Sequence, residues 1–294
     1  MSLEEQLSGW TGPSSDSEKG KQERTERMVR EAIDAHSRFD DCELSVYAKG
    51  SYPNNTNVRM DSDVDIAVEC TEAEYWGEAK PGAHVPQSRY KGKWTPTELR
   101  KELNAALVKK FTSDVDASGS TAIRVHSSSA RVEADVVPCF SYRYYLSRKK
   151  SRVGTKVFKT DGSSVINYPA QQLTNGTEKN KRTGHAYKRA VRILKRVQNA
   201  MVQSGHSDEL PSYFIECLAY NCPDQLFSGS NWTEIVRATL IHFWNELDGD
   251  EPEDPNSRWK EVNGNFFLFH SKQKWTRADG RSFSLAAWNH LGFS

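Results

Sequence analysis

The sequence predicts an α/β chain whose first half holds a sheet and whose second half is helical. Short apolar runs at residues 44–48 and 64–68 are typical of strands. A run with helical spacing, residues 23–39, precedes them. Later in the chain the apolar positions recur mainly at helical intervals, most clearly over residues 183–203. We therefore expect a flexible N-terminal arm at 1–22, an α/β core at 23–170 and a helical C-terminal lobe at 171–294.

Composition argues against several classes of protein. The chain has 40 basic and 39 acidic residues, so its overall charge implies no general attraction to nucleic acid or to membranes. Five cysteines occur without a Cys-x-x-Cys pair, which favours reduced thiols over a disulfide framework or a zinc site. The sequence has neither an apolar stretch of membrane length nor a signal peptide, so a cytoplasmic protein is expected.

The N-terminal region is expected to change from loose to helical. Residues 1–22 are polar and rich in Ser, Gly and Glu, which favours a flexible arm. In the helix expected at residues 23–39, an apolar stripe that includes Val29 and Ile33 should face the sheet, with Arg27 outside. The first strand follows at residues 44–48.

The residues that say most about function follow that strand. Gly50 and Ser51 form a flexible corner beside a hydroxyl. Asp63 and Asp65 open the next apolar run, and because strand side chains alternate faces, the two carboxylates share one face. Carboxylates placed side by side repel each other, and hard oxygen ligands of this kind suit Mg²⁺ or Mn²⁺. The pattern predicts a cation site at the start of this strand.

A calcium loop is the ordinary alternative for such an acidic run. Counted from Asp61, an EF-hand loop needs glycine at its sixth position and glutamate at its twelfth. The sixth residue here is Ile66, inside an apolar run, although Glu72 stands at the twelfth. The missing glycine argues against the EF-hand.

A third carboxylate lies on a later strand. Residues 130–138 are short, β-branched and stopped by proline, and Glu133 and Asp135 share one face of the predicted strand. Asp135 stands directly before an apolar pair, as Asp65 does, so we favour Asp135 as the third ligand and hold Glu133 in reserve. A strand at residues 121–125 should pair with this one, and paired strands lie about 4.8 Å apart.

The segment between the two acidic strands looks irregular. Residues 70–94 hold several glycines and prolines among aromatic residues, which indicates a loop that either covers the acceptor or is a variable excursion; we favour the second. Thr95 and Glu98 then form a capping box around Pro96 at the start of a helix.

Residues 141–168 alternate aromatic and basic side chains, which is typical of a solvated hairpin and less often of a nucleic-acid surface. The pair Asp161–Gly162 marks its turn. Asn167 ends the run, either as a strand-end residue or as a base contact.

The second half supplies basic helices. Lys188 and Lys195 lie on the helix expected at residues 183–203, where a solvated basic face is the ordinary interpretation. Ser212 and Tyr213 open another helix after a proline, and free N–H groups at a helix start attract phosphate. A further helix is expected at residues 232–247, capped by Ser230 and Asn231.

Together these residues resemble the cGAS/DncV-like nucleotidyltransferases, or bacterial CD-NTases of the CdnE-like kind, a branch of the DNA polymerase β-like superfamily. The resemblance covers about residues 44 to 220, and six motifs occur in the family order. They are Gly50–Ser51–Tyr52 with Thr56 and Arg59, Ser62 to Asp65, Asp135 to Pro138, Asn167–Tyr168–Pro169, residues 188–195 and residues 211–216.

The resemblance implies a catalytic core with a mixed sheet, a helical C-terminal lobe and an active-site cleft between them. It implies that Asp63, Asp65 and Asp135 are catalytic and hold two Mg²⁺ ions, with Mn²⁺ as a possible substitute. Gly50 and Ser51 would contact phosphate.

The same resemblance assigns nucleotide contacts. Lys195 would meet the triphosphate, with Lys188 as the runner-up. Ser212 would contact phosphate and Tyr213 would stack on a base. An asparagine at position 167 resembles the branch that selects pyrimidines, because an amide can both donate to and accept from the uracil edge.

The implied function is Mg-dependent joining of nucleoside triphosphates, UTP and ATP among them, into a cyclic di- or trinucleotide. Such products are second messengers of bacterial anti-phage (CBASS) signalling and are sensed by a separate effector. A cytoplasmic monomer without a nucleic-acid activator is expected. Two alternatives stay open: transfer to another acceptor, such as an RNA end, a small molecule or a protein, and a catalytically idle module that senses nucleotide or RNA.

Overall fold

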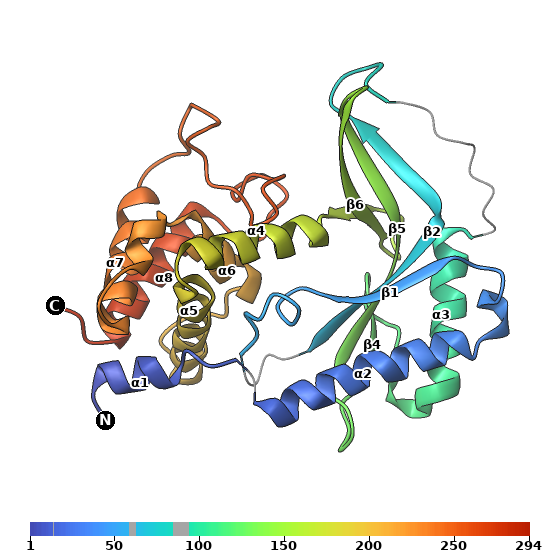
Figure 1. The fold of residues 1–294 in the computed structure, drawn as a ribbon, viewed down its shortest axis with the longest axis horizontal. Helices are drawn as coiled ribbons and strands as arrows, with labels where there is room; N and C mark the ends of the chain where they lie inside the picture. The colour runs from blue at the N-terminus through green and yellow to red at the C-terminus, as the bar shows by residue number, and fades with distance from the viewer. Residues whose placement is uncertain (14, 59–62, 85–93) are drawn as a thin grey trace. The chain divides into compact units, whose positions relative to one another are not determined.

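The computed structural model describes residues 1–13, 15–58, 63–84 and 94–294 of the chain. The chain divides into two compact units (Figure 1). The sheet unit comprises Ser15–Tyr52 and Asp61–Pro169, and the helical unit comprises Met1–Ser14, Pro53–Met60 and Ala170–Ser294. Arg59 and Ser62, which contribute to the family resemblance, lie outside the described residues.

The sheet unit is built on one mixed sheet. Its strands follow the order β1-β2-β5-β4-β3, and β6 and β7 continue from β5. Strands β2 and β5 are parallel, and the other described pairs are antiparallel. The strands are β1 (Leu44–Lys49), β2 (Val64–Glu78), β3 (Val115–Asp116), β4 (Ile123–Val125), β5 (Ala134–Ser147), β6 (Lys150–Phe158) and β7 (Ser164–Asn167). The predicted pairing of the strand at 121–125 with the Asp135 strand is confirmed by β4 and β5.

Two helices, α2 (Asp16–Asp34) and α3 (Pro96–Phe111), share one hydrophobic core with one face of this sheet. Val64 and Ile66 of β2 are fully buried in that core. Ala67 belongs to a smaller cluster with Val137 and Cys139. Because neighbouring strand residues alternate faces, Asp65 lies on the same face as Ala67, opposite the helices.

The predicted start of α3 is confirmed in detail. Pro96 is the first helical residue, the Thr95 hydroxyl accepts from the backbone N–H of Glu98 at 3.2 Å, and Glu98 accepts from the backbone N–H of Thr95 at 3.0 Å. The apolar stripe predicted from the spacing is the buried face of the helix. It consists of Leu99, Leu103, Ala106, Leu107 and Phe111.

The prediction that residues 70–94 are irregular was wrong for the first part of that segment. Strand β2 continues to Glu78, paired with β5 as far as Tyr145, and the register shifts between Cys70 and Glu74. The pairing with β5 supplies the backbone hydrogen bonds that the composition did not predict. Figure 1 shows β2, β5 and β6 extending together beyond the helix-covered part of the sheet. Residues 85–93 lie outside the described residues.

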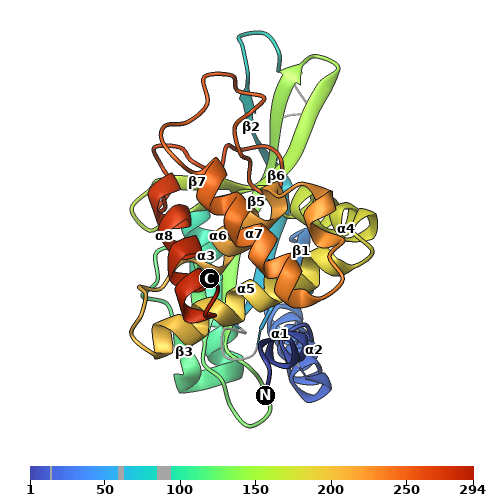
Figure 2. The same cartoon turned by 90° about the vertical axis from the view of Figure 1, so that its left-hand side faces the viewer.

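The helical unit packs around α5. Its helices are α1 (Leu3–Gly9), α4 (Pro169–Arg182), α5 (Ala186–Gln203), α6 (Ser212–Asn221), α7 (Trp232–Glu246) and α8 (Arg277–His290). Apolar residues of α5, α6, α7 and α8 form one buried cluster, and α7 and α8 lie side by side (Figure 2). The predicted cap of α7 is confirmed, because Asn231 accepts from the backbone N–H of Glu234 at 2.9 Å.

The expectation of a flexible arm at residues 1–22 is corrected by the structure. Leu7 of α1 is fully buried in the core of the helical unit, and Glu4 accepts hydrogen bonds from the backbone N–H groups of Trp232 and Thr233. Helix α2 already begins at Asp16. One buried leucine among polar residues gives no periodic signal, so the composition alone indicated a flexible arm.

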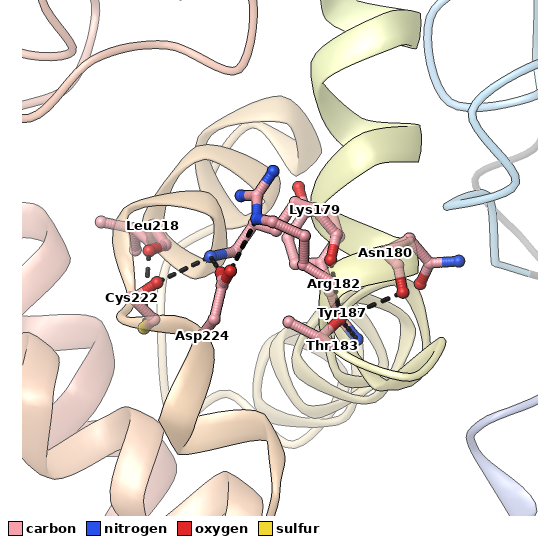
Figure 3. Close-up of polar contacts among 8 residues, drawn as sticks. All are labelled: Lys179, Asn180, Arg182, Thr183, Tyr187, Leu218, Cys222 and Asp224. Atoms are coloured by element: carbon pink, nitrogen blue, oxygen red, sulfur yellow. Dashed lines mark hydrogen bonds and ion pairs between the residues drawn. The ribbon is translucent and has the colours of Figure 1, made fainter.

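Helix α4 was not predicted, and it carries a buried cation. Lys179 donates to the backbone carbonyl of Cys222 at 2.7 Å and to Asp224 at 2.8 Å, and Arg182 donates to the other oxygen of Asp224 at 2.7 Å (Figure 3). The Lys179 ammonium also lies over three aromatic rings, at 5.7 Å from Tyr187 and Tyr220 and 5.1 Å from Phe227. Cation–π contacts and an ion pair together compensate this buried charge.

The structure also tests the expectations about membrane helices and cysteines. In the described residues, the structure has no helix with the length and apolar character needed to cross a membrane. All five cysteines are free, as the scattered spacing predicted.

Candidate active site

Parallel pairing of β2 with β5 places two of the predicted acids opposite each other. Asp65 and Asp135 are register partners on these neighbouring strands. Asp63 directly precedes β2, and its carboxyl group interacts electrostatically with Asp65, Asp135 and Glu133. The structure therefore brings the three predicted acids, and the reserve candidate Glu133, to one place on the sheet.

Gly50 makes room for the carboxylate of Asp65. A Cβ atom on Gly50 would stand 2.6 Å from Oδ2 of Asp65, and the backbone φ of +75° is one that side chains disfavour. The preceding residue, Lys49, is the register partner of Asp65 on β1. Ser51 follows in the turn and is half-buried. The corner predicted at Gly50 therefore lies directly against the acid cluster.

The negative charges of Asp63 and Asp65 are only partly balanced by nearby positive charges. Burial raises the pKa of Asp65, Lys49 opposes this shift, and the nearby charge of Asp135 adds to it. Partial burial raises the pKa of Asp63, although this side chain reaches the surface, and the charges of Glu133 and Asp135 raise it further. Elevated carboxylate pKa values indicate unfavourable negative charge that a cation would relieve.

Arg124 is a site residue that the sequence analysis missed. It is the register partner of Asp135 on β4, and its Nε lies 3.3 Å from Oδ1 of Asp135 and 3.2 Å from Oε1 of Glu133. These carboxylates raise the pKa of Arg124, with the Asp135 hydrogen bond as the largest cause. The signal was present in the strand alternation, because position 124 faces away from the buried Ile123 and Val125.

The donor types fit a hard divalent cation. Three aspartates supply only oxygen atoms, which Mg²⁺ and Mn²⁺ prefer. The carboxylate oxygens of the three aspartates are more widely spaced than their suitability as ligands would suggest. In the described residues, three ligand atoms that lie within 4.8 Å of one another occur at Cys42, Cys70 and Glu72, and not among the aspartates. In this arrangement Arg124 occupies one oxygen of Asp135.

Asn167 is the last residue of β7 and is half-buried. It pairs with Thr155 of β6, and its backbone carbonyl leaves no room for a side chain at Gly154, where a Cβ would stand 2.5 Å away. The strand-end position predicted for Asn167 is confirmed, whereas its contact with a base stays a prediction.

The predicted phosphate lysines belong to a buried polar group in the helical unit. Lys195 is 2% exposed and its Nζ lies 3.5 Å from Glu216, which also accepts from the Thr56 hydroxyl at 2.7 Å. Lys188 is 8% exposed and donates to Thr177 at 3.4 Å. Burial lowers the pKa of Lys188, and the charge of Glu216 opposes that shift. The carboxylate of Glu216 therefore partners Lys195 inside this unit.

Helix α6 begins at Ser212, as predicted, with Pro211 at the cap position. Ser212 is exposed, and Tyr213 is half-buried with its hydroxyl 3.3 Å from Glu261 and its ring 6.5 Å from that of Trp275. Through these contacts Tyr213 packs within the helical unit, and its stacking on a base stays a prediction. The cleft expected between the two lobes stays a prediction.

Comparison with known proteins adds independent findings. A family profile described as the cGAS/DncV-like nucleotidyltransferase C-terminal helical domain matches residues 174–292. The chain is 36% identical to the cyclic dipyrimidine nucleotide synthase CdnE of Cecembia lonarensis, over 99% of this chain and 98% of that protein. It is 34% identical to a cyclic dipurine nucleotide synthase of Elizabethkingia meningoseptica, over 99% and 98%.

A solved structure gives the same result for the fold. The Rhodothermus marinus CdnE c-UMP-AMP synthase with Apcpp and Upnpp superimposes with a TM-score of 0.81 at 25% identity, covering 99% of this chain and 97% of that chain. The mixed sheet and the helices of the two units are thus those of a known enzyme fold, and the predicted fold class is confirmed.

Proposed function

Because the chain belongs to the cGAS/DncV-like nucleotidyltransferases, we propose that this enzyme joins two nucleoside triphosphates into a cyclic dinucleotide. The observation that carries the proposal is the register of β2 and β5, which sets Asp65 opposite Asp135 with Asp63 beside them. Relatives that span nearly the whole chain are named as synthases of cyclic nucleotides. A nucleotide- or RNA-sensing module would not need three intact acids at this place.

The three aspartates are the groups that would hold Mg²⁺, or Mn²⁺ in its place. A bound ion of this kind lowers the pKa of a hydroxyl nucleophile and neutralises charge on the phosphoryl group that is transferred. Gly50 keeps the space beside Asp65 open, and the Ser51 hydroxyl can donate to a phosphate oxygen. Lys49 opposes the effect of burial on the pKa of Asp65, and Arg124 forms an ion pair with Asp135, so the chain places positive charge beside the acids.

Lys195 is proposed as a phosphate contact with Lys188 as its alternative. The charge of Glu216 interacts with both Lys195 and Lys188, and its carboxylate accepts a hydrogen bond from Thr56. Glu216, held by Thr56, would therefore keep the Lys195 ammonium in place before substrate binds. Ser212, at the exposed start of α6, would contact phosphate through its hydroxyl and the free N–H groups there. Tyr213 would contribute one face of its ring to a base.

The choice of bases is the finer part of the proposal. A dipyrimidine synthase and a dipurine synthase are almost equally identical to this chain, so overall identity does not decide between them. We favour UTP together with ATP, because an amide at Asn167 can both donate to and accept from uracil, and because a structure of similar fold holds analogues of both. The product would act as a second messenger in anti-phage (CBASS) signalling and would be sensed by a separate effector.

The direct test is to incubate the purified protein with all four nucleoside triphosphates and Mg²⁺ and to identify products by mass spectrometry. We expect a cyclic dinucleotide that contains uridine, with pyrophosphate released. A product made only of purines would overturn the base assignment and leave the enzyme class intact. A nucleotide attached to an added RNA end or small molecule, without a cyclic product, would establish the other acceptor class instead.

A further inference from the structure

A second group of possible metal ligands lies farther along β2 than the aspartates and differs from them in chemistry. The thiols of Cys42 and Cys70 and the carboxylate of Glu72 bring one ligand atom each to within 4.8 Å of one another. Cys42 stands just before β1, and the antiparallel pairing of β1 with β2 sets Leu44 opposite Cys70. Pairing of two strands, and not a local motif, therefore creates this group.

Backbone contacts hold the group in place. Oε1 of Glu72 accepts from the backbone N–H of Glu43 at 3.0 Å. The N–H and the hydroxyl of Thr71 both donate to the carbonyl of Glu43, at 2.9 and 3.1 Å. Three hydrogen bonds thus tie the residue after Cys42 to the two residues after Cys70. Carboxylates that bind metals are commonly oriented by such outer hydrogen bonds.

Accessibility also suits a site that takes up an ion. Cys70 is fully buried, whereas Cys42 and Glu72 are half-buried and give the site an approach from solvent. The thiols of Cys42 and Cys70 form a side-chain hydrogen bond with each other, so the two sulfur atoms already lie side by side. By contrast, the thiol of Cys222, which caps the end of α6, donates to the carbonyl of Leu218, as structural cysteines do.

We propose that Cys42, Cys70 and Glu72 bind a thiophilic divalent cation of the Zn²⁺ class, with a fourth position open to water or another ligand. Two thiolates and one carboxylate are ligands that Zn²⁺ accepts in tetrahedral geometry. Sulfur ligands select Zn²⁺ over Mg²⁺, so this site and the aspartates would take different ions from the same solution. Binding converts two thiols to thiolates and releases their protons to solvent.

The site would fasten the start of edge strand β1 to the place where the register of β2 shifts. A ligand that binds only the folded state stabilises it in proportion to the logarithm of its concentration above the dissociation constant. We therefore expect Zn²⁺ to raise the thermal unfolding temperature of the full-length protein, and Mg²⁺ at the same concentration to leave this edge unaffected.

The test uses the full-length, reduced and chelator-treated protein, titrated with Co²⁺ as a spectroscopic substitute for Zn²⁺. One Co²⁺ per chain should give a thiolate-to-metal charge-transfer band that Zn²⁺ abolishes. Cys42→Ser and Cys70→Ser should each remove the band, and Glu72→Gln should weaken Co²⁺ binding at least about tenfold, in the range seen when groups that support a site are changed. Cys139→Ser, which changes a buried cysteine on the same sheet, is the matched control and should keep the band.

Three results would overturn the proposal. They are a wild-type protein without the band, a band that survives in the Cys42→Ser and Cys70→Ser proteins, and loss of two titratable thiols as a disulfide with no metal bound. The wild-type spectrum is decisive by itself, so the test does not depend on whether the Cys70 variant folds.

Discussion

Asp65 in the sheet unit and Asp224 in the helical unit are both half-buried carboxylates, yet their environments shift the pKa in opposite directions. Burial would raise the pKa of Asp224, but hydrogen bonds from Arg182 and Lys179 bring it below its ordinary value (Figure 3). Burial raises the pKa of Asp65, and Lys49 opposes that shift incompletely. One carboxylate is paired with cations that the chain provides, whereas the other carries charge that the chain leaves for a ligand to balance.

The comparison separates stability from function. Lys179 is 3% exposed and is surrounded by an ion pair, a carbonyl and three rings, so the region around Asp224 favours a single rigid arrangement. The acids on β2 and β5 repel each other, which disfavours the folded state unless a cation is present. Changes in the two regions should therefore have opposite effects on the free energy of unfolding and on catalysis.

The largest expected effect is on catalysis. Changing Asp63→Asn together with Asp65→Asn removes two of the three charges that would hold Mg²⁺, and metal-ion stabilisation of the transition state amounts to several kcal/mol. Pyrophosphate release should fall at least about a thousandfold. Asp161→Asn, which alters an exposed carboxylate of the β6–β7 turn, is the control and should retain activity. Undiminished activity in the double variant would remove the acids from the mechanism.

The second effect concerns the free energy of unfolding. Asp224→Asn leaves the Lys179 ammonium buried without its ionic partner, and breaking a buried pair costs about 3–5 kcal/mol. Because Asp224 is 33% exposed, we expect about 3 kcal/mol in urea denaturation. Asp65→Asn in metal-free protein should cost nothing or stabilise the fold. If Asp65→Asn destabilises as strongly as Asp224→Asn, the contrast between the two regions does not exist.

The third effect isolates the contact between Gly50 and Asp65. Gly50→Ala should cost about 1–2 kcal/mol for the left-handed backbone and should also displace the carboxylate, lowering activity at least about tenfold. Gly162 has a similar φ of +82°, with no atom within 4 Å of its added Cβ. Gly162→Ala should therefore show the backbone cost without the loss of activity. Equal activities of the two variants would show that position 50 matters only for its backbone.

The smallest effect is on the pH dependence of stability in metal-free protein. The lowered pKa of Asp224 contributes stability that is present above the unfolded value of about 3.9 and is lost as pH falls through the folded value. The raised pKa of Asp65 acts in the opposite way, and its contribution is lost as pH rises through the folded value. Unfolding curves of the wild type and Asp65→Asn should therefore diverge in favour of the variant as pH rises above about 3.9. Parallel curves would contradict the assigned charge environment.

The strands that carry the acids could be predicted because their signals are local. Val64 and Ile66 alternate with Asp63 and Asp65, and the core requires that alternation. The cap at Thr95 was equally local. Leu7 gave no periodic signal, and the pairing of Glu78 with Tyr145 depends on a partner strand far along the chain.

Residues that meet only through strand pairing were harder to predict than the acids. Arg124 lies on the exposed side of a three-residue strand, and its partner Asp135 becomes apparent only from the register of β4 with β5. Cys42 and Cys70 meet through the register of β1 with β2 and show no metal-binding spacing in the sequence. Local patterns predict which residues face together within one strand, whereas tertiary pairing decides which strands meet.

We propose that Asp135, opposite Asp65, completes the catalytic group. The test is to measure the rate at which the wild type, Asp135→Asn and Glu133→Gln form cyclic product from nucleoside triphosphates and Mg²⁺. These two acids are separated by one residue in the sequence, and both pair with Arg124. Each variant is therefore the matched control of the other. We predict that Asp135→Asn loses the product and that Glu133→Gln retains it. Retention by Asp135→Asn with loss in Glu133→Gln would contradict the account.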